Sequence, residues 1–301
     1  MIYQHPLAYL LGLEGIALLR AWAGDFDEPF VRRRLAEVRR LLADESLAGH
    51  PGVVVRRGDT LTGYRQWAAG YDEPRNSLFD ADEPLMHEIL DDLPAGTALD
   101  AACGTGRYAA HLAARGHRVV GVDNSPDMLD RARARVPGAR FLRADLHRLP
   151  VADDAVDLVV SGLALAHAPD LVPVMAEFAR VLRPGGHLVI SDVHRDLVFL
   201  GSVPKALGPA GEPGLAATHR HTTGDYLRAA IAAGLQVRRC EEPRQQPTGG
   251  PLPPAEITVT GWEDWPWSLM ALVPEALRAA AGPPVVVWHF RLTGPGRHPA
   301  S

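Results

Sequence analysis

The chain has 301 residues, of which 47% are hydrophobic and 22% are charged, enough for one large domain with an appendage or for two small domains. The formal net charge is −5, and no stripe of arginines interleaved with aromatic residues occurs, which argues against nucleic acid as a partner. The two cysteines, Cys103 and Cys240, form no disulfide framework and no zinc spacing. We therefore predict a cytoplasmic protein without a metal site.

The first 58 residues are predicted to form a helical extension. Apolar residues recur at helical spacing over residues 7–22 and 28–42, residues 52–57 form an extended connector, and residues 61–69 form a further helix. The first helix lacks a preceding basic segment, contains Glu14 and is too short to span a bilayer, so it is neither a signal peptide nor a membrane anchor. These helices would serve as a lid over a pocket, as the interface of a homodimer, or as both.

From Asp80 onward, strand and helix patterns alternate. A helix is expected at residues 83–93, and the expected strands cover 97–102, 118–123, 139–144, 156–162 and 187–192, with a tight turn at 183–186 before the last of them. Helical segments lie between the first four strands and before the fifth. This alternation predicts an α/β fold with a doubly wound, mostly parallel sheet.

The C-terminal part departs from that alternation. A helix at residues 222–233 precedes a strand at 235–240, and the final strand at 285–292 is expected to pair with it as an antiparallel hairpin. The insertion at about 244–284 is rich in proline, glycine and tryptophan. Its tryptophans would form a small satellite core or cover an acceptor pocket, and the first reading is favoured.

The run Leu99-Asp-Ala-Ala-Cys-Gly-Thr-Gly106 reads as a buried strand that breaks into a glycine turn and opens a helix. Such a turn binds a ligand that contains a nucleoside. A dinucleotide site has the pattern G-x-G-x-x-G, and Ala109 stands here in the third glycine position. The turn alone therefore leaves the ligand open.

Five ordered segments together resemble the class I S-adenosylmethionine-dependent methyltransferases, in particular the small-molecule group that includes ubiquinone-biosynthesis and natural-product enzymes. The segments are the glycine turn, Val119-Val-Gly-Val-Asp-Asn-Ser-Pro126, Ala144-Asp-Leu-His-Arg-Leu-Pro150, Val156-Asp-Leu-Val-Val160 and Val181-Leu-Arg-Pro-Gly-Gly186. The resemblance covers roughly residues 60–241. It implies a seven-stranded Rossmann-like sheet whose last strand is antiparallel, in a domain that spans residues 59–301.

The resemblance implies S-adenosylmethionine as the cofactor and S-adenosylhomocysteine as the product. Asp123 ends a strand about twenty residues after the turn, where a carboxylate accepts hydrogen bonds from both ribose hydroxyls. Met128 would pack on the adenine, and Asp145 would accept from the adenine amino group. The implied cofactor-binding set is Tyr71, Asp100, Ala102, Gly104, Gly106, Asp123, Asn124, Met128, Ala144, Asp145, Leu146 and Ser161, with Tyr64 and Gly162 as weaker candidates.

Ala102 departs from the family pattern, which usually has glycine at this position. We interpret the alanine as a sign that the backbone there accepts a β-carbon without strain.

Transfer of a methyl group from a sulfonium is an in-line displacement, so no covalent intermediate and no catalytic triad is needed. A hydroxyl acceptor often needs a general base, and histidines near the carboxyl ends of the strands are the natural candidates. The predicted catalytic residues are His167, which is preferred, and His194 and His221, with His219 as a further candidate.

The sequence thus predicts methyl transfer to a small apolar or aromatic molecule, at oxygen, in secondary metabolism. One alternative keeps the cofactor without transfer, either as an enzyme that catalyses cyclisation or as a sensor of S-adenosylmethionine. The other alternative is an NAD-dependent oxidoreductase, which the segment from Ala144 to Pro150 and the closing hairpin disfavour.

Overall fold

The computed structural model describes residues 1–58, 63, 77–243, 251–252 and 255–293. It divides the chain into two compact units: unit 1 holds residues 1–59, 200–216 and 244–282, and unit 2 holds residues 60–199, 217–243 and 283–301. The sequence-based division placed all of residues 59–301 in one domain, whereas two parts of that range group with the N-terminal residues. The helix expected at 61–69, with Tyr64 and Tyr71, lies outside the described residues.

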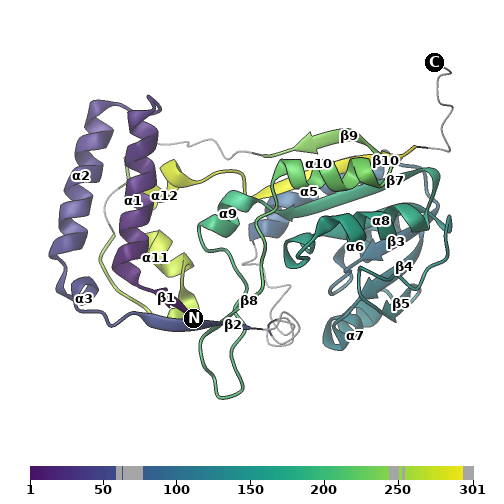
Figure 1. Ribbon diagram of the computed structural model, residues 1–301, viewed down its shortest axis with the longest axis horizontal. Helices are drawn as coiled ribbons and strands as arrows, with labels where there is room; N and C mark the ends of the chain where they lie inside the picture. Colours follow the sequence, from purple (N-terminus) through teal and green to yellow (C-terminus); the bar gives the residue numbers. More distant parts are fainter. Residues whose placement is uncertain (59–62, 64–76, 244–250, 253–254, 294–301) are drawn as a thin grey trace. The chain divides into compact units, whose positions relative to one another are not determined.

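Unit 2 is built on a seven-stranded sheet with the strand order β5-β4-β3-β6-β7-β10-β9 (Figure 1). The strands are β3 (Thr97–Ala101), β4 (Arg118–Asp123), β5 (Arg140–Arg143), β6 (Val156–Gly162), β7 (Leu182–Val193), β9 (Leu235–Glu241) and β10 (Val285–Leu292). The strands from β5 to β7 are parallel, and β10 runs antiparallel to both β7 and β9. The predicted doubly wound sheet with an antiparallel last strand is confirmed.

Helices cover both faces of this sheet, as its continuous apolar strands require. On one face the core joins α8 and α10 to the sheet through Phe178, Tyr226 and Trp288. On the other face α5, α6 and α7 contribute Met86, Tyr108 and Leu129. The helices of unit 2 are α5 (Ser77–Asp91), α6 (Arg107–Ala114), α7 (Pro126–Arg135), α8 (Leu171–Val181), α9 (Arg195–Phe199) and α10 (Thr223–Ala232), with a 3-10 turn η1 (Leu165–His167).

The start of β7 differs from the sequence-based expectation. The run 183–186 was predicted as a tight turn before a strand that begins at residue 187, but β7 begins at Leu182 and includes this run. Val156 pairs with Leu182, whereas Leu158 pairs with His187, so the register shifts by several residues between the two pairs. Gly185 sits at φ +82°, a conformation that glycine adopts without strain, so the extra residues are accommodated as an irregularity inside the strand.

A buried acid ties α5 to α6 and to the sheet. Asp82 is fully buried, and its carboxylate accepts two hydrogen bonds from the Arg107 guanidinium, at 3.0 and 2.9 Å. The hydroxyls of Tyr108 and Ser191 donate to the same carboxylate, at 2.6 and 2.7 Å. The donors that the buried charge needs therefore come from two elements, α6 and β7.

Unit 1 combines a small sheet with a helical bundle. In the sheet, β1 (Ile2–Gln4) pairs antiparallel with β2 (Val53–Gly58), which pairs parallel with β8 (Gly214–Ala216). The helix α1 (Pro6–Trp22) packs on α2 (Glu28–Ala43), α11 (Trp267–Leu272) and α12 (Pro274–Ala280), and the short α3 (Glu45–Ala48) follows α2. The two N-terminal helices and the extended connector match the predicted ranges closely, whereas neither β1 nor β8 was predicted.

The tryptophan-rich segment belongs to the core of unit 1. Trp262, in the 3-10 turn η2 (Trp262–Asp264), and Trp265 are each 5% exposed and pack with Leu10, Leu13 and other apolar residues of the helices. Trp267 remains half exposed. The favoured expectation of a satellite core is confirmed for the first two tryptophans, and this packing is the reason that the insertion groups with the N-terminal helices.

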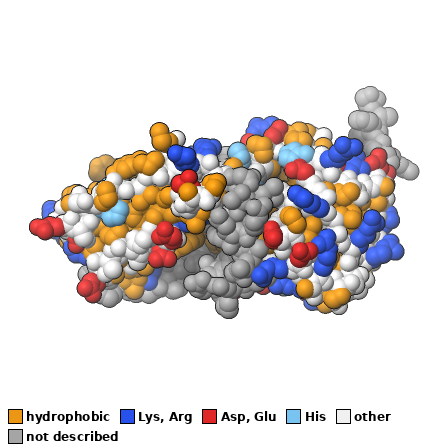
Figure 2. Space-filling model, turned by 90° about the horizontal axis from the view of Figure 1, so that it is seen from below, with side chains coloured by type: hydrophobic (Ala, Val, Ile, Leu, Met, Phe, Trp, Pro, Cys, Tyr) orange, Lys and Arg blue, Asp and Glu red, His pale blue; other side chains and the backbone are white. Residues whose placement is uncertain are grey.

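Charged groups of both signs are mixed on the surface. Figure 2 shows basic and acidic side chains interspersed with hydrophobic ones on the face that it displays. Among the described residues, no helix combines the length and the apolar character that a bilayer crossing requires.

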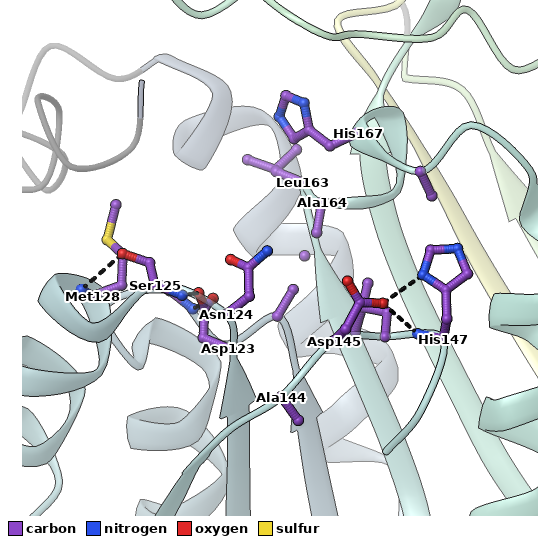
Figure 3. Close-up of a pocket in the computed structure, with 15 residues that line it drawn as sticks. Asp123, Asn124, Ser125, Met128, Ala144, Asp145, His147, Leu163, Ala164 and His167 are labelled. Atoms are coloured by element: carbon purple, nitrogen blue, oxygen red, sulfur yellow. Dashed lines mark hydrogen bonds and ion pairs between the residues drawn. The ribbon is translucent and has the colours of Figure 1, made fainter. Parts of the chain in front are cut away.

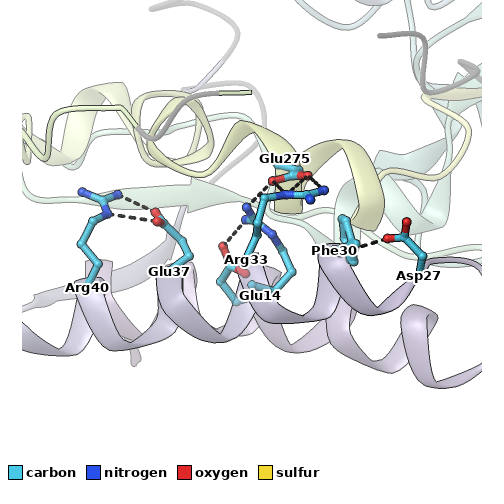
Figure 4. Close-up of polar contacts among 8 residues, drawn as sticks. Glu14, Asp27, Phe30, Arg33, Glu37, Arg40 and Glu275 are labelled. Atoms are coloured by element: carbon cyan, nitrogen blue, oxygen red, sulfur yellow. Dashed lines mark hydrogen bonds and ion pairs between the residues drawn. The ribbon is translucent and has the colours of Figure 1, made fainter. Parts of the chain in front are cut away.

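A polar network lies inside the helical bundle of unit 1 (Figure 4). Glu14 on α1 is fully buried, and Arg34 on α2, 6% exposed, bridges it to Glu275 on α12. Arg33 also contacts Glu275, at 2.7 Å. Burial raises the pKa of Glu14 to about 7, despite the opposing charge of Arg34.

We expect the pKa of Glu14 to make the protein less stable as the pH rises. The unfolded carboxyl binds its proton less tightly than the folded one, so the free energy of unfolding falls between about pH 4.5 and pH 7. Relative to Glu14→Gln, the wild type should lose about 2 kcal/mol between pH 5 and pH 7.5. Urea unfolding at both pH values measures this difference, with the exposed Glu28→Gln as the control. Parallel pH profiles for the wild type and Glu14→Gln would contradict it.

Candidate functional site

A pocket opens at the carboxyl ends of β3, β4, β5 and β6 in unit 2 (Figure 3). Ligands of doubly wound sheets bind at this edge, because the loops after neighbouring parallel strands converge there. The lining residues are Ala102, Gly104, Asp123, Asn124, Ser125, Met128, Ala144, Asp145, Leu146, His147, Gly162, Leu163, Ala164, His167 and Ala168.

The glycine turn after β3 is held against β4 by backbone contacts. Cys103 N donates to the carbonyl of Val122 at 2.9 Å, and Gly106 N donates to the carbonyl of Cys103 at 2.8 Å. Gly106 sits at φ +81° and caps α6, and a β-carbon there would lie 3.1 Å from Cβ of Ala132 on α7. Glycine at this position therefore serves both the left-handed backbone and the close packing of α6 on α7.

Asp123 stands at the end of β4 and faces the turn. Its Oδ2 accepts from Gly104 N at 2.9 Å, and its Oδ1 accepts from Ser125 N at 2.8 Å. An ionised carboxylate has about four acceptor positions, so each oxygen keeps one for a ligand. The pKa of Asp123 is raised above its usual value because the carboxyl is buried, and the hydrogen bonds from the backbone N–H groups offset only part of this rise.

Two helix-start residues form the wall beside Asp123. The Ser125 hydroxyl caps α7 by accepting from Met128 N, which fixes the first turn of this helix at the pocket. Met128 is 2% exposed, and its side chain supplies apolar surface to the lining. Asn124, the next residue after Asp123, is exposed and also lines the pocket (Figure 3).

Asp145 lies across the pocket, directly after β5. Its Oδ1 accepts two hydrogen bonds from His147, one from the backbone N at 2.8 Å and one from the ring Nδ1 at 2.5 Å. Burial acts to raise the pKa of Asp145, but these two donors outweigh it and the pKa is lowered. The carboxylate is therefore ionised and acts only as an acceptor near neutral pH.

Comparison with known proteins bears on this site. A family model described as "Methyltransferase domain" matches residues 99–190, a range that runs from within β3 to within β7 and includes all the lining residues of the pocket. A solved S-adenosylmethionine-dependent methyltransferase from Mesorhizobium loti aligns over 70% of this chain and 97% of its own, with 25% identity and a TM-score of 0.50. The chain carries a class I S-adenosylmethionine-dependent methyltransferase domain.

Curated relatives agree with this family over part of their length. The malonyl-[acyl-carrier protein] O-methyltransferase of Serratia marcescens is 34% identical over 137 residues, 46% of this chain and 53% of that protein. Methyltransferase GfsG of Streptomyces halstedii is 41% identical over 115 residues, 36% of this chain and 41% of that protein. The chain thus spans about half the length, or less, of these relatives.

The methyltransferase domain brings most of the predicted cofactor residues to one pocket. Those that line it are Ala102, Gly104, Asp123, Asn124, Met128, Ala144, Asp145, Leu146 and the weaker candidate Gly162. Asp100, Gly106 and Ser161 do not line it. Asp100 is buried and accepts a hydrogen bond from Ala109 N at 2.8 Å, so it anchors the first turn of α6. Burial raises the pKa of Asp100 to about 7.

Ser161 and Gly162 end β6 in different environments. Ser161 is fully buried, and its hydroxyl finds no hydrogen-bond partner among the described residues. At Gly162 a β-carbon would lie 2.3 Å from Cε2 of Tyr108, so glycine is required for the close approach of α6 to this strand end. Of the two predicted residues, only Gly162 faces the pocket.

The fourth wall of the pocket is the loop Leu163 to Ala168, which is fastened by the segment before α10. His219 N donates to the carbonyl of Ala166 at 2.7 Å, and ring nitrogens of His167 and His221 contact the carbonyls of Ala217 and Ala168, each at 2.8 Å. Of the predicted catalytic histidines, only His167 lines the pocket.

His194 and His221 are not among the residues that line the pocket. His194 is buried at the end of β7, where its Nδ1 accepts from Asp196 N at 3.2 Å and its Nε2 lies 3.5 Å from Glu242. Nε2 of His221 contacts the Ala168 carbonyl at 2.8 Å. Both rings thus contact loop residues, and their action on an acceptor stays a prediction.

Five lining residues were absent from the predicted binding set. They are Ser125, His147, Leu163, Ala164 and Ala168. Ser125 lies in the segment from Val119 to Pro126 that carries the resemblance but was not named as a binding residue. His147 carried a usable signal, because a histidine two residues after a strand-end acid can contact its carboxylate. The three apolar residues carried no signal, since only the fold of their loop turns them toward the pocket.

The interpretation of Ala102 is corrected by its backbone. Ala102 sits at φ +56°, in the left-handed region that an L-residue with a β-carbon adopts only at a cost of roughly 1–2 kcal/mol. The position therefore has the conformation that favours the family's glycine, and the alanine is strained.

Ala102→Gly should stabilise the methyltransferase domain by about 1 kcal/mol, because glycine adopts this φ without strain and its greater freedom in the unfolded chain offsets part of the gain. Chemical denaturation of the two proteins measures the difference. Ala110→Gly, inside α6, is the matched control and should destabilise by about 1 kcal/mol. A lower stability of Ala102→Gly would contradict the strain.

Proposed function

We propose that this protein transfers the methyl group of S-adenosylmethionine to a small molecule. The observation that carries the proposal is the charge of the pocket: Asp123 and Asp145 line it, and no lysine or arginine is among the described lining residues. Such a wall suits a cationic sulfonium ligand. A dinucleotide would place its pyrophosphate on the glycine turn and the start of α6, where Ala109 stands in the third glycine position of the dinucleotide pattern. The NAD-dependent alternative is thereby the weaker reading.

The lining residues fit the parts of S-adenosylmethionine. The acceptor positions left on Asp123 would take the two ribose hydroxyls, Met128 would pack on the adenine, and Asp145 would take the adenine amino group. Gly104 allows the methionine tail to pass close to the backbone of the turn. When bound, the cofactor supplies an electrophilic methyl on a positively charged sulfur.

The chain's own part in the reaction is alignment and exclusion of water. The rigid strand ends hold the donor side, while the loop Leu163 to Ala168 presents an apolar wall to the acceptor. Holding two reactants in line is worth on the order of 7–11 kcal/mol, which makes a covalent intermediate unnecessary. An apolar or aromatic acceptor matches this wall, and the O-methyltransferase relative from Serratia supports oxygen as the methylated atom.

In this proposal His167 acts as the general base. The Ala217 carbonyl can only accept, so the contact at 2.8 Å requires the proton on Nδ1 and leaves the lone pair of the neutral ring on Nε2. Burial lowers the pKa of His167, and the nearby His219 lowers it further. The ring is therefore neutral at pH 7 and can take a proton from a hydroxyl acceptor.

Calorimetry should detect S-adenosylhomocysteine binding and no comparable binding of NAD. Asp123→Asn should weaken S-adenosylhomocysteine about 10- to 100-fold, because hydrogen bonds to a charged acceptor are each worth about 1.5–3 kcal/mol. Asp130→Asn removes an exposed acid of α7 and is the control, which should bind like the wild type. Tight binding of NAD alone would overturn the proposal.

Turnover should fall on the acid side of the pH profile with a pKa below 6.5, since protonation removes the lone pair of His167. His167→Gln should lower kcat by about 10²- to 10⁴-fold and abolish this acid limb. S-adenosylhomocysteine formation with a panel of phenols and aliphatic alcohols provides the assay, and His111→Gln, outside the pocket lining, provides the control. Unchanged turnover of His167→Gln across pH would refute the role as base.

A further inference from the structure

His147 is a pocket residue whose contacts are directed at one oxygen of Asp145. Both the backbone N and the ring Nδ1 of His147 reach Oδ1, at 2.8 and 2.5 Å. An ionised carboxylate has no proton to give, so Nδ1 must carry the hydrogen. Figure 3 shows both contacts as the two dashed lines that join the residues.

The other oxygen of Asp145 is left for a ligand. Among the residues that the structure describes, none donates a hydrogen bond to Oδ2. Asp145 and His147 both line the pocket. Two donors thus occupy one oxygen and leave its neighbour as the acceptor on the pocket wall.

This arrangement matters because Asp145 has little else to hold it. Its side chain is 61% exposed, and the side chain of His147 is 41% exposed, so neither is fixed by packing. A free aspartate at such a position would lose rotamer freedom on binding, a cost that a preformed contact removes.

We propose that His147 is a positioning residue that fixes Asp145 so that Oδ2 selects a purine carrying a 6-amino group. The inference rests on the proposed function, in which the pocket holds S-adenosylmethionine. A 6-amino group donates to the fixed oxygen, whereas a 6-oxo group presents a second acceptor to it and is rejected. His147 acts through Asp145 and touches no reacting atom.

The test compares two ligands by calorimetry, S-adenosylhomocysteine and S-inosylhomocysteine, which carries oxygen in place of the 6-amino group. The wild type should prefer S-adenosylhomocysteine. His147→Leu should weaken S-adenosylhomocysteine about threefold to tenfold, the range expected for one side chain that is no longer held in place, while affinity for S-inosylhomocysteine does not fall. His147→Asn, whose side-chain amide N–H can replace Nδ1–H, should restore most of the loss.

Two further variants separate positioning from a general structural effect. In the background of Asp145→Ala, His147→Leu should have no additional effect on S-adenosylhomocysteine, because the two residues act as one unit. His111→Leu breaks another histidine–aspartate contact in unit 2, the one to Asp91 at 2.8 Å, and lies outside the pocket lining. It should leave both affinities unchanged.

The failures are distinguishable. If the wild type binds S-adenosylhomocysteine and His147→Leu changes its affinity less than twofold, or weakens both ligands equally, the positioning role is wrong and the proposed function stands. If the wild type binds neither ligand, the proposed function fails and the inference fails with it.

Discussion

The hydrogen bond from Gly104 N to Oδ2 of Asp123 joins the turn after β3 to the end of β4. Because these strands are parallel neighbours, their carboxyl ends already lie side by side, and this contact adds a fixed orientation for the carboxylate. Ser125 N holds the second oxygen and starts α7 at the same point. The donor half of the pocket therefore depends on one acid that is oriented by backbone groups of two loops.

The acceptor half depends on a different set of backbone contacts. Three contacts join the loop Leu163 to Ala168 to residues 217–221: His219 N donates to the Ala166 carbonyl, the His167 ring contacts the Ala217 carbonyl, and the His221 ring contacts the Ala168 carbonyl. The buried Asp192 accepts a hydrogen bond from the Tyr226 hydroxyl at 2.5 Å. Burial raises the pKa of Asp192 to about 7. The residues that hold this loop come from α10 and its approach, far along the chain, which explains why His219 and His221 are close to the pocket without lining it.

Much of unit 2 could be predicted because its signals are local. A parallel strand that is buried on both faces appears in the sequence as an apolar run, and the start of a helix is indicated by a capping residue such as Ser125. Asp123 could be placed because it ends such a run, whereas Asp145 could be placed because the segment from Ala144 to Pro150 resembles the family. The strain at Ala102 could not be predicted, since φ at one position is set by the hydrogen bonds of the whole turn.

By itself, the sequence determined the order of strands and helices, the glycine turn and the acids at the strand ends, because each depends on residues within a few positions of one another. Tertiary structure alone decided which histidine reaches the pocket and that residues 200–216 and 244–282 group with the N-terminal helices. These outcomes depend on contacts between residues distant in the chain or on the path of a loop, and neither leaves a periodic pattern in the sequence.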